Sequence, residues 1–164
     1  MEEINLRRLN EARHARVAAI LVTYVDTGTE RVLLEGEVID ELLSGLVSQS
    51  FLTGRSCLAE VEGRKCFLNI HLPAPRLAII GAVHIGQTLA QMALLAGFDT
   101  RVIDPRTAFA TKDRFPGVAL LADWPVDALD RYTAMVAVTH DPKIDDDPIG
   151  EALLSHWNAG IDHP

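Results

Sequence analysis

The chain has 164 residues, of which 48% are hydrophobic and only 5% aromatic, and its formal net charge is −8. A chain of this length buries an aliphatic core without disulfides or metals, and its apolar share excludes disorder over the whole length. Its acidic balance opposes nonspecific binding to nucleic acid or to an anionic membrane surface, because both carry negative charge.

From the sequence we expect neither a membrane span nor a leader segment. No stretch approaches the run of about 18 apolar residues that a spanning helix needs, and the charged N-terminal segment lacks the apolar core of a signal peptide. Cys57 and Cys66 are too few for a disulfide scaffold and do not form a metal-binding pair motif. We therefore expect a cytoplasmic protein in which both cysteines are small core residues.

The segment before a proline-containing linker is expected to form a small α+β unit, residues 1–72. Its predicted elements are a helix at 2–16, strands at 17–25 and 31–34, a helix at 37–46, and strands at 57–61 and 66–72. The first helix is predicted from a charged stretch, the second from apolar residues at helical spacing, and the strands from apolar runs that are partly β-branched. The last two strands are expected to pair as a hairpin around Glu62 and Gly63.

Residues 73–164 alternate between strands and helices. The predicted elements are a strand at 76–80, a helix from 85 to about 96, strands at 100–103, 118–121 and 134–138, and a last helix that starts at Asp147–Pro148. Asp147 suits an N-cap and Pro148 the first helical position. The alternation predicts an α/β protein in which a partial Rossmann-like parallel sheet follows the N-terminal α+β unit.

The turn after the first strand of this second part has the sequence G-A-V-H-I-G. A dinucleotide-binding turn reads G-x-G-x-x-G between a strand and a helix, and Gly81 and Gly86 occupy its first and third glycine positions. Val83 replaces the middle glycine, which lets the backbone approach a pyrophosphate. A β-branched side chain at this position is expected to block that approach and to resist a positive φ.

An acid and a base follow at the end of the next strand. Asp104 stands where dinucleotide-binding folds place an acid on the ribose, and the alternative is an acid that caps the following turn. Arg106 is expected either to contact a phosphate or to pair with Asp104. The first turn of the helix, around Ile85, also offers N–H groups to an anion.

Two histidines are expected at the same crevice, where the carboxyl ends of the strands meet. His84 either contacts a ligand or donates a proton, or else it shapes the turn. His140 with Asp141 either orients a substrate or transfers protons, and the alternative for Asp141–Pro142 is a turn before the last helix. The candidate catalytic residues are His84, His140 and Asp141; the candidate cofactor-binding residues are Gly81, Ala82, Val83, His84, Ile85, Gly86, Asp104, Arg106, Thr139 and His140. No metal ligands are assigned, because the acids at 145–147 are typical of a solvated helix start.

The runs PAPRLAIIGAVHIGQTLAQMALLAGFDTRVIDPR and VAVTHDPKIDD resemble the C-terminal domain of the XdhC/CoxI family. The residues that match the family are Gly81, Ala82, His84, Gly86, Asp104, Arg106, Thr139, His140, Asp141, Pro142, Lys143 and Asp145. Members are accessory factors that bind molybdenum cofactor and help to mature xanthine dehydrogenase and related enzymes. The resemblance, which covers about residues 73–154, implies a Rossmann domain, molybdenum cofactor as ligand and a molybdenum hydroxylase as client.

Three functions stay open on the sequence. The first is an XdhC/CoxI-like accessory protein that binds molybdenum cofactor or a nucleotide-like ligand and assists the maturation of a molybdenum hydroxylase, which is a binding role and not an enzymatic one. The second is an NAD(P)-dependent oxidoreductase with His84 or His140 as proton donor. The third is a degenerate Rossmann module kept for self-association or partner binding, which Val83 favours. A sheet of only four predicted strands leaves an apolar edge or face uncovered, so we also expect a homodimer.

Overall fold

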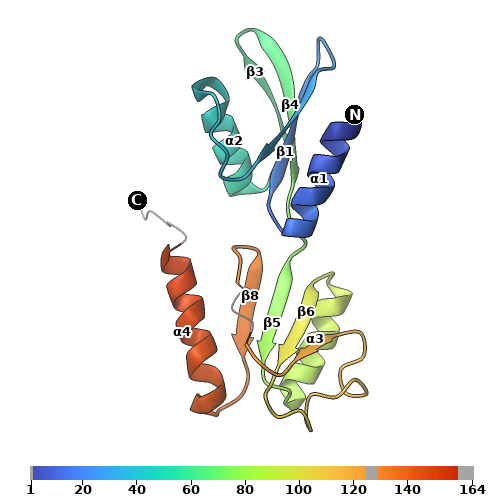
Figure 1. Ribbon diagram of the computed structural model, residues 1–164, viewed down its shortest axis with the longest axis vertical. Helices are drawn as coiled ribbons and strands as arrows, with labels where there is room; N and C mark the ends of the chain where they lie inside the picture. The colour runs from blue at the N-terminus through green and yellow to red at the C-terminus, as the bar shows by residue number, and fades with distance from the viewer. Residues whose placement is uncertain (1, 125–128, 159–164) are drawn as a thin grey trace. The chain divides into compact units, whose positions relative to one another are not determined.

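The computed structural model describes residues 2–124 and 129–158. The chain forms two compact units, Met1–Pro73 and Ala74–Pro164, and their elements are labelled in Figure 1. Each unit contains a four-stranded sheet. None of the helices in the described part of the chain combines the length and the apolar character that crossing a membrane would require.

The first unit is an antiparallel sheet with two helices, which confirms the predicted α+β character. Its elements are α1 (Glu3–Ala15), β1 (Ala19–Tyr24), β2 (Glu30–Leu34), α2 (Glu41–Thr53), β3 (Cys57–Val61) and β4 (Arg64–His71). The strand order is β2-β1-β4-β3, with every neighbouring pair antiparallel. The helix expected at 37–46 begins at Glu41 and continues to Thr53.

Alternation along β1 divides the core of this unit between the two helices. Ala19 and Leu21 pack in one cluster with Ala12 of α1 and Val32 of β2. The intervening Ile20 is also fully buried, and successive strand residues point to opposite faces. Helix α2, which buries Leu43, Val47 and Phe51, contacts β3 and β4.

The hairpin of β3 and β4 is confirmed and contains both cysteines. Glu62 and Gly63 have φ values of 51° and 76°, as the tight turn between two antiparallel strands requires. Cys66 is buried, and this burial raises the pKa of its thiol. Cys57 is half-buried, with its Sγ 3.6 Å from Oγ of Ser50. Both thiols are free.

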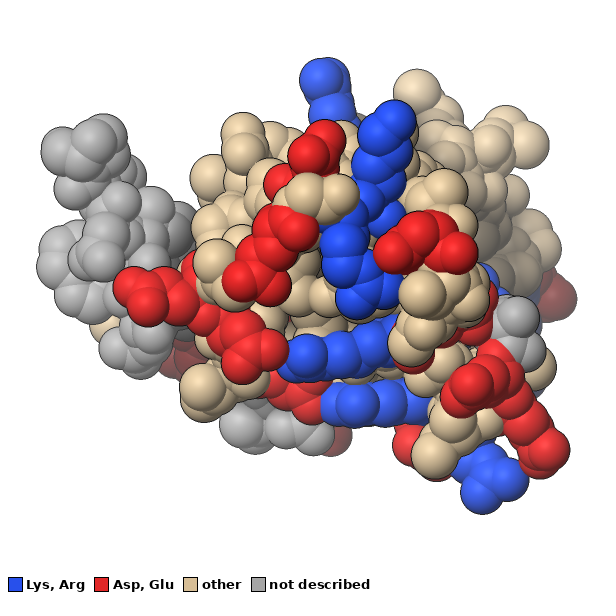
Figure 2. Space-filling model, turned by 90° about the horizontal axis from the view of Figure 1, so that it is seen from above, with Lys and Arg blue, Asp and Glu red and all other residues tan. Residues whose placement is uncertain are grey.

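Charges of both signs are interleaved on the surface of the first unit. Arg64 forms a pair of hydrogen bonds with the Asp26 carboxylate, at 3.0 and 3.1 Å, and Arg7 pairs with Glu3 one helical turn away. In Figure 2 the basic side chains lie between acidic ones on the face shown. That face therefore presents mixed charge, although the chain as a whole is acidic.

The second unit is a parallel sheet flanked by helices, as predicted for a partial Rossmann-like fold. Its elements are β5 (Arg76–Ile80), α3 (His84–Leu95), β6 (Asp99–Ile103), β7 (Ala119–Leu121), β8 (Thr133–Ala137) and α4 (Pro142–Asn158). The strand order is β7-β6-β5-β8, with every pair parallel. The chain thus adds strands on one side of β5 and then crosses to its other side, and open α/β sheets bind ligands at such a switch point.

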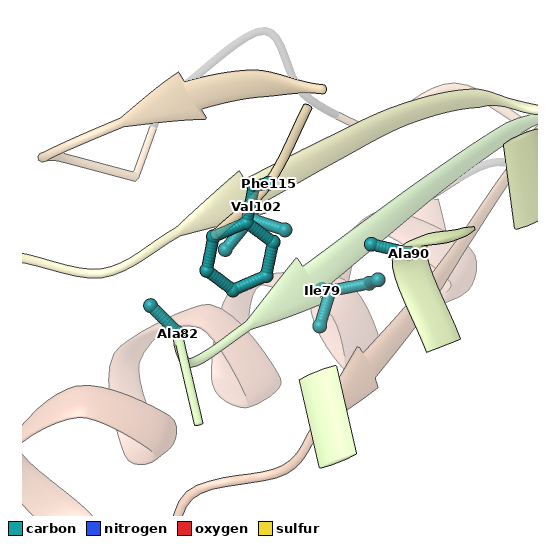
Figure 3. Close-up of a cluster of buried hydrophobic side chains, with 5 residues drawn as sticks. All are labelled: Ile79, Ala82, Ala90, Val102 and Phe115. Carbon is teal, nitrogen blue, oxygen red and sulfur yellow. The ribbon is translucent and has the colours of Figure 1, made fainter. Parts of the chain in front are cut away.

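Both faces of the parallel sheet are covered. Ile79 and Val102 lie in a cluster with Ala82, Ala90 of α3 and Phe115 (Figure 3). Their strand neighbours face the other way, where Ala78, Ile80 and Ile103 form a second cluster with Ile144 of α4. Strands buried on both faces read as continuous apolar runs, which is the pattern of RLAII at 76–80.

The predicted start of the last helix, at Asp147–Pro148, is wrong. Helix α4 begins at Pro142, and Pro148 lies inside it. The Asp141 carboxylate accepts the N–H of Lys143 at 3.1 Å, so Asp141 is the N-cap and Pro142 the first helical residue. The same Asp-Pro signal occurs twice within a few residues, and the earlier copy starts the helix even though Pro148 lacks the N–H of a helical hydrogen bond.

Candidate functional site

A crevice of about 450 Å³ lies at the switch point of the parallel sheet, at the end to which the arrows of β5 and β8 point in Figure 1. It is lined by Val83, His84, Ile85, Arg106, Val138, Thr139, His140 and Asp141. The lining comes from the turn after β5, the loop after β6 and the segment after β8. The fold therefore brings together most of the residues that the sequence picks out.

The two glycines of the turn are required by close packing. Gly81 has a φ of 112°, and a Cβ on it would lie 2.2 Å from Cγ2 of Thr139. A Cβ on Gly86 would lie 2.5 Å from the carbonyl oxygen of Gly81. The first glycine thus lets the segment after β8 approach β5, and the last lets α3 start directly against the turn.

Val83 adopts an ordinary extended conformation, with a φ of −85° and a ψ of 175°. The expectation that a β-branched residue would resist a positive φ here is wrong, because this position needs none. Val83 is the N-cap of α3, and its side chain accepts no hydrogen bond from the first helical turn. Its side chain lines the crevice. Valine in place of the middle glycine therefore affects a ligand only through the space that this side chain occupies.

Asp104 is fully buried and is engaged by the chain itself. Its Oδ2 accepts the N–H of Ala82 at 2.8 Å, and its Oδ1 accepts the N–H of Arg106 at 2.8 Å. Burial alone would raise the pKa of this carboxyl, but the hydrogen bonds from Arg106 and Ala82 outweigh it and hold the pKa below its ordinary value. This geometry corresponds to the turn-capping alternative, with the carboxylate directed into the protein.

Arg106 is held by Asp104 in a fixed orientation. Its Nε and Nη2 donate to the two carboxylate oxygens at 3.0 and 2.8 Å, and this hydrogen bonding raises the pKa of the guanidinium. The side chain remains 38% exposed and lines the crevice. A guanidinium positioned in this way can meet a phosphate while its charge also compensates the buried carboxylate.

The segment after β8 is fixed by hydrogen bonds around Thr139. The buried hydroxyl of Thr139 donates to the Asp145 carboxylate and accepts the N–H of Asp141 at 3.3 Å. Asp141, whose carboxylate caps α4, therefore forms the turn that was the alternative to a proton-transfer role. His84 and His140 have exposed side chains at the crevice, where their imidazoles can contact a ligand.

The acids at 145–147 do not converge. Asp145 is buried against Thr139, whereas Asp146 and Asp147 are exposed. Within residues 2–124 and 129–154, no group of three or more His, Cys, Asp or Glu side chains is arranged to hold a metal ion.

A second hollow, of about 320 Å³, adjoins the crevice and was not predicted from the sequence. It is lined by Ala82, Val83, His84, Arg106, Phe109 and Arg114. The loop between β6 and β7 supplies Phe109 and Arg114, and no recognisable motif marks it. The sequence feature that could have indicated this hollow is Phe109, which lies between Arg106 and Arg114 in the loop after Asp104.

Comparison with known proteins agrees with this architecture. A protein of Escherichia coli K12, described as uncharacterized protein YqeB, is 33% identical over 94 residues, which cover 51% of this chain and 17% of YqeB. A crystal structure described as a xanthine dehydrogenase from Bacillus halodurans has a TM-score of 0.60 at 20% identity. The match covers 89% of this chain and 47% of that one, and at this identity it shows the fold alone.

The chain therefore spans less than half of the solved structure and about one sixth of YqeB. The family comparison is more specific, since the model of the XdhC Rossmann domain matches residues 77–160. That segment is just over half of the chain and contains the crevice, the two glycines of the turn, and the Asp104–Arg106 pair. By this match the chain belongs to the XdhC family, through its Rossmann domain.

Proposed function

We propose that this protein binds molybdenum cofactor in the crevice between β5 and β8 and assists the maturation of a molybdenum hydroxylase. Membership of the XdhC family supports the proposal. The observation that carries it is that the first turn of α3, which has no side-chain cap, and the guanidinium of Arg106, which is held by Asp104, both lie at the switch point of the sheet.

The phosphate end of a phosphate-bearing pterin fits this part of the crevice. The first turn of α3 has N–H groups without a side-chain cap, and the positive end of the helix dipole favours an anion there. The exposed part of the Arg106 guanidinium lies on the same side and offers hydrogen-bond donors there, while its charge compensates the buried Asp104 carboxylate. Because Asp104 is buried and paired with Arg106, its carboxylate does not face the phosphate.

The ring of the cofactor fits the remaining wall. The exposed imidazoles of His84 and His140 offer hydrogen bonds, and Ile85 and Val138 offer apolar contact. Both cysteines of the chain lie in the first unit, and neither lines the crevice. The crevice residues would therefore hold the cofactor by its phosphate and its ring, and not through a thiolate. The redox chemistry that molybdenum cofactor supplies operates in the client enzyme, while this chain binds, orients and releases the cofactor.

The test is a calorimetric titration of the protein with molybdenum cofactor, NAD and NADP in parallel. We expect binding of the molybdenum cofactor, weakened roughly ten- to hundredfold in Arg106→Gln, since one charge-assisted hydrogen bond contributes roughly 1.5–3 kcal/mol. Arg101→Gln is the matched control, because Arg101 lies in β6 and does not line the crevice. Arg106→Lys retains the charge next to Asp104 and separates lost binding from lost folding.

The other outcomes discriminate between the alternatives. Binding of NAD or NADP in preference to molybdenum cofactor would contradict the proposal and favour an oxidoreductase. If none of the three ligands binds to the natural sequence but one binds to Val83→Gly, the module is degenerate. A glycine at position 83 removes the side chain that lines the crevice without relieving any backbone strain.

We further propose that the protein is a homodimer. In the described part of the chain, β8 is hydrogen-bonded to β5 and forms one edge of the parallel sheet. An exposed edge strand is a template for pairing with another strand. A second copy of the chain would cover this edge in a symmetric dimer.

A further inference from the structure

We propose that the first unit contains a binding site for a small aliphatic carboxylate, in a cavity between α1 and the antiparallel sheet. The cavity has a volume of about 460 Å³, which is within the range of small-molecule sites. We call it the α1 cavity, and its lining residues all belong to the first unit. None of the described residues that line it also lines the crevice, so the inference does not rest on the proposed function.

The α1 cavity arises because the two helices of the first unit cover different strands. Helix α1 contacts β1 and β2, whereas α2 contacts β3 and β4, and in Figure 1 the helices lie to either side of the strands. Ala19 and Leu21 of β1 face α1, where they pack with Ala12. In the register of β1 and β4, His71 is opposite Ala19 and Asn69 is opposite Leu21. Directly opposite residues share a face of the sheet, so these two polar side chains of β4 lie on the same face as α1.

Aliphatic side chains form most of the lining of the α1 cavity. They include Leu6 and Leu9 of α1 and Leu21 of β1. None of the described lining residues is Phe, Tyr or Trp, so the cavity offers no aromatic face on which a planar base could stack. Burial of an apolar group depends on its area and not on a directional contact. The lining therefore favours an alkyl chain.

Two polar residues mark one end of the α1 cavity. Arg13 lies in the last turn of α1, and the chain continues from there into β1, whose first residue is Ala19. His71 is opposite Ala19, so Arg13 and His71 lie at the same end of the sheet. Leu6 shares the helix face of Arg13 because the two are seven residues, or two turns, apart. That spacing puts the apolar end of the cavity roughly 10 Å from the polar end along the helix axis.

Arg13 gives the polar end a positive charge that no described residue neutralises. The other arginines within α1 are paired, Arg7 with Glu3 and Arg8 with Glu37. The side chain of Arg13 forms no ion pair or hydrogen bond with any residue that the structure describes. Moreover, no Asp or Glu is among the described residues that line the cavity. Because a guanidinium matches a carboxylate with two parallel hydrogen bonds, the charge of this end is complementary to a carboxylate.

A hydrogen-bonded network orients the polar groups on β4. The hydroxyl of Ser56 accepts the N–H of Ile70 at 3.1 Å and donates to Oδ1 of Asn69 at 3.3 Å. This directs Nδ2 of Asn69 toward Nε2 of His71, at 3.2 Å. An amide nitrogen only donates, so Nε2 is the acceptor and Nδ1 carries the proton of the neutral ring. The Nδ1–H has no partner among the described residues and is a second donor for the carboxylate.

The test is a calorimetric titration of the intact protein with octanoate, 1-octanol and octylammonium. We expect octanoate to bind about tenfold more tightly than 1-octanol, because only the carboxylate accepts charge-assisted hydrogen bonds from Arg13. Octylammonium, which the guanidinium repels, should bind more weakly than either. Affinity should also rise about fourfold with each CH₂ from butanoate to octanoate, as burial of the chain requires.

Two variants test the two ends of the α1 cavity. Arg13→Gln should weaken octanoate about tenfold and leave 1-octanol unchanged, and Arg7→Gln is its control, because Arg7 lies on α1 outside the cavity. Leu6→Ser should weaken both ligands. Ile4→Ser is the control for this change, because Ile4 is an exposed residue of α1 that does not line the cavity. Leu6 is itself 44% exposed, so its replacement leaves the fold intact.

The backbone amide chemical shifts of the labelled natural protein locate the site without any substitution. Octanoate should change the shifts of Arg13, Leu21 and His71 most, since these residues line the α1 cavity. The inference is overturned if octanoate changes only shifts of the second unit or does not bind. It is also overturned if octanoate and 1-octanol bind equally, or if Arg13→Gln and Arg7→Gln have the same effect on octanoate.

Discussion

Replacement of Gly81 by alanine tests how the turn holds the crevice together. Gly81 has a φ of 112°, and an added Cβ would lie 2.2 Å from Cγ2 of Thr139, well inside the 3.4 Å at which ordinary contact begins. Two terms oppose the alanine. The backbone conformation costs ~1–3 kcal/mol for a residue with a side chain, and overpacking costs a further ~1–3 kcal/mol. We expect Gly81→Ala to lower the free energy of unfolding by about 4 kcal/mol.

Thr139→Ser separates these two terms. The change removes Cγ2 and keeps the hydroxyl that donates to Asp145 and accepts the Asp141 N–H. By itself it should cost about 1 kcal/mol, the value of a buried methyl group. In the Gly81→Ala background it removes the steric overlap, so the double variant should be more stable than the sum of the single changes by about 2 kcal/mol.

The assay is urea unfolding followed by tryptophan fluorescence. Trp124 and Trp157 both lie in the second unit, so the signal reports the sheet that carries the crevice and not the first unit. The reasoning is refuted if Gly81→Ala costs less than about 1 kcal/mol, the lower bound of either term alone. It is also refuted if the two changes are additive, because the Cβ and Cγ2 atoms would then not be in contact.

Three further predictions concern the same unit. Although burial opposes the shift, hydrogen bonds from Arg106 and Ala82 hold the pKa of Asp104 below its ordinary value. The ionised carboxylate therefore stabilises the fold above the ordinary pKa of an aspartate, and this stabilisation is lost as the pH falls through the lower, folded-state pKa. The urea midpoint should decline below about pH 4 in the wild type and decline less in Asp104→Asn; equal declines would contradict the assignment. Asp141→Ala should lower the free energy of unfolding by about 1 kcal/mol, because it removes an N-cap, whereas Asp147→Ala inside α4 should lower it by less than about 0.5 kcal/mol. The reverse order would indicate that the helix starts at Asp147 instead. Light scattering after gel filtration should give twice the monomer mass of 17.9 kDa, and a stable monomer would exclude the homodimer.

The sequence predicted the fold best where a residue pattern is compatible with only one local structure. The run RLAII, followed by a turn that begins and ends with glycine, predicts a buried parallel strand leading into a helix, and β5 and α3 confirm it. The start of α4 was not predictable from its local signal, because Asp-Pro occurs at 141–142 and again at 147–148. In the structure the earlier copy starts the helix, and the hydrogen bond from Thr139 to Asp145 joins the segment after β8 to the first turn of α4.

The sequence predicted where the candidate site lies in the fold better than it predicted the contacts of the residues in it. The observed strand order β7-β6-β5-β8 places the residues after β5 and β8 together. The alternation of elements predicts the parallel sheet, and the resemblance to a Rossmann domain is what implies this order. The buried Asp104 carboxylate accepts four hydrogen bonds, one from the Ala82 N–H and three from the backbone N–H, Nε and Nη2 of Arg106, and no spacing rule gives their directions. Phe109 lies in a loop without periodicity, so its place beside the crevice emerged only from the structure.

The central claim is that the crevice between β5 and β8 holds the phosphate-bearing pterin of molybdenum cofactor. The most direct measurement is the change in backbone amide chemical shifts of the labelled protein when the cofactor is added. The claim predicts the largest changes at His84, Ile85, Arg106 and His140, which line the crevice. Changes confined to the first unit, or no change at the start of α3, would contradict it.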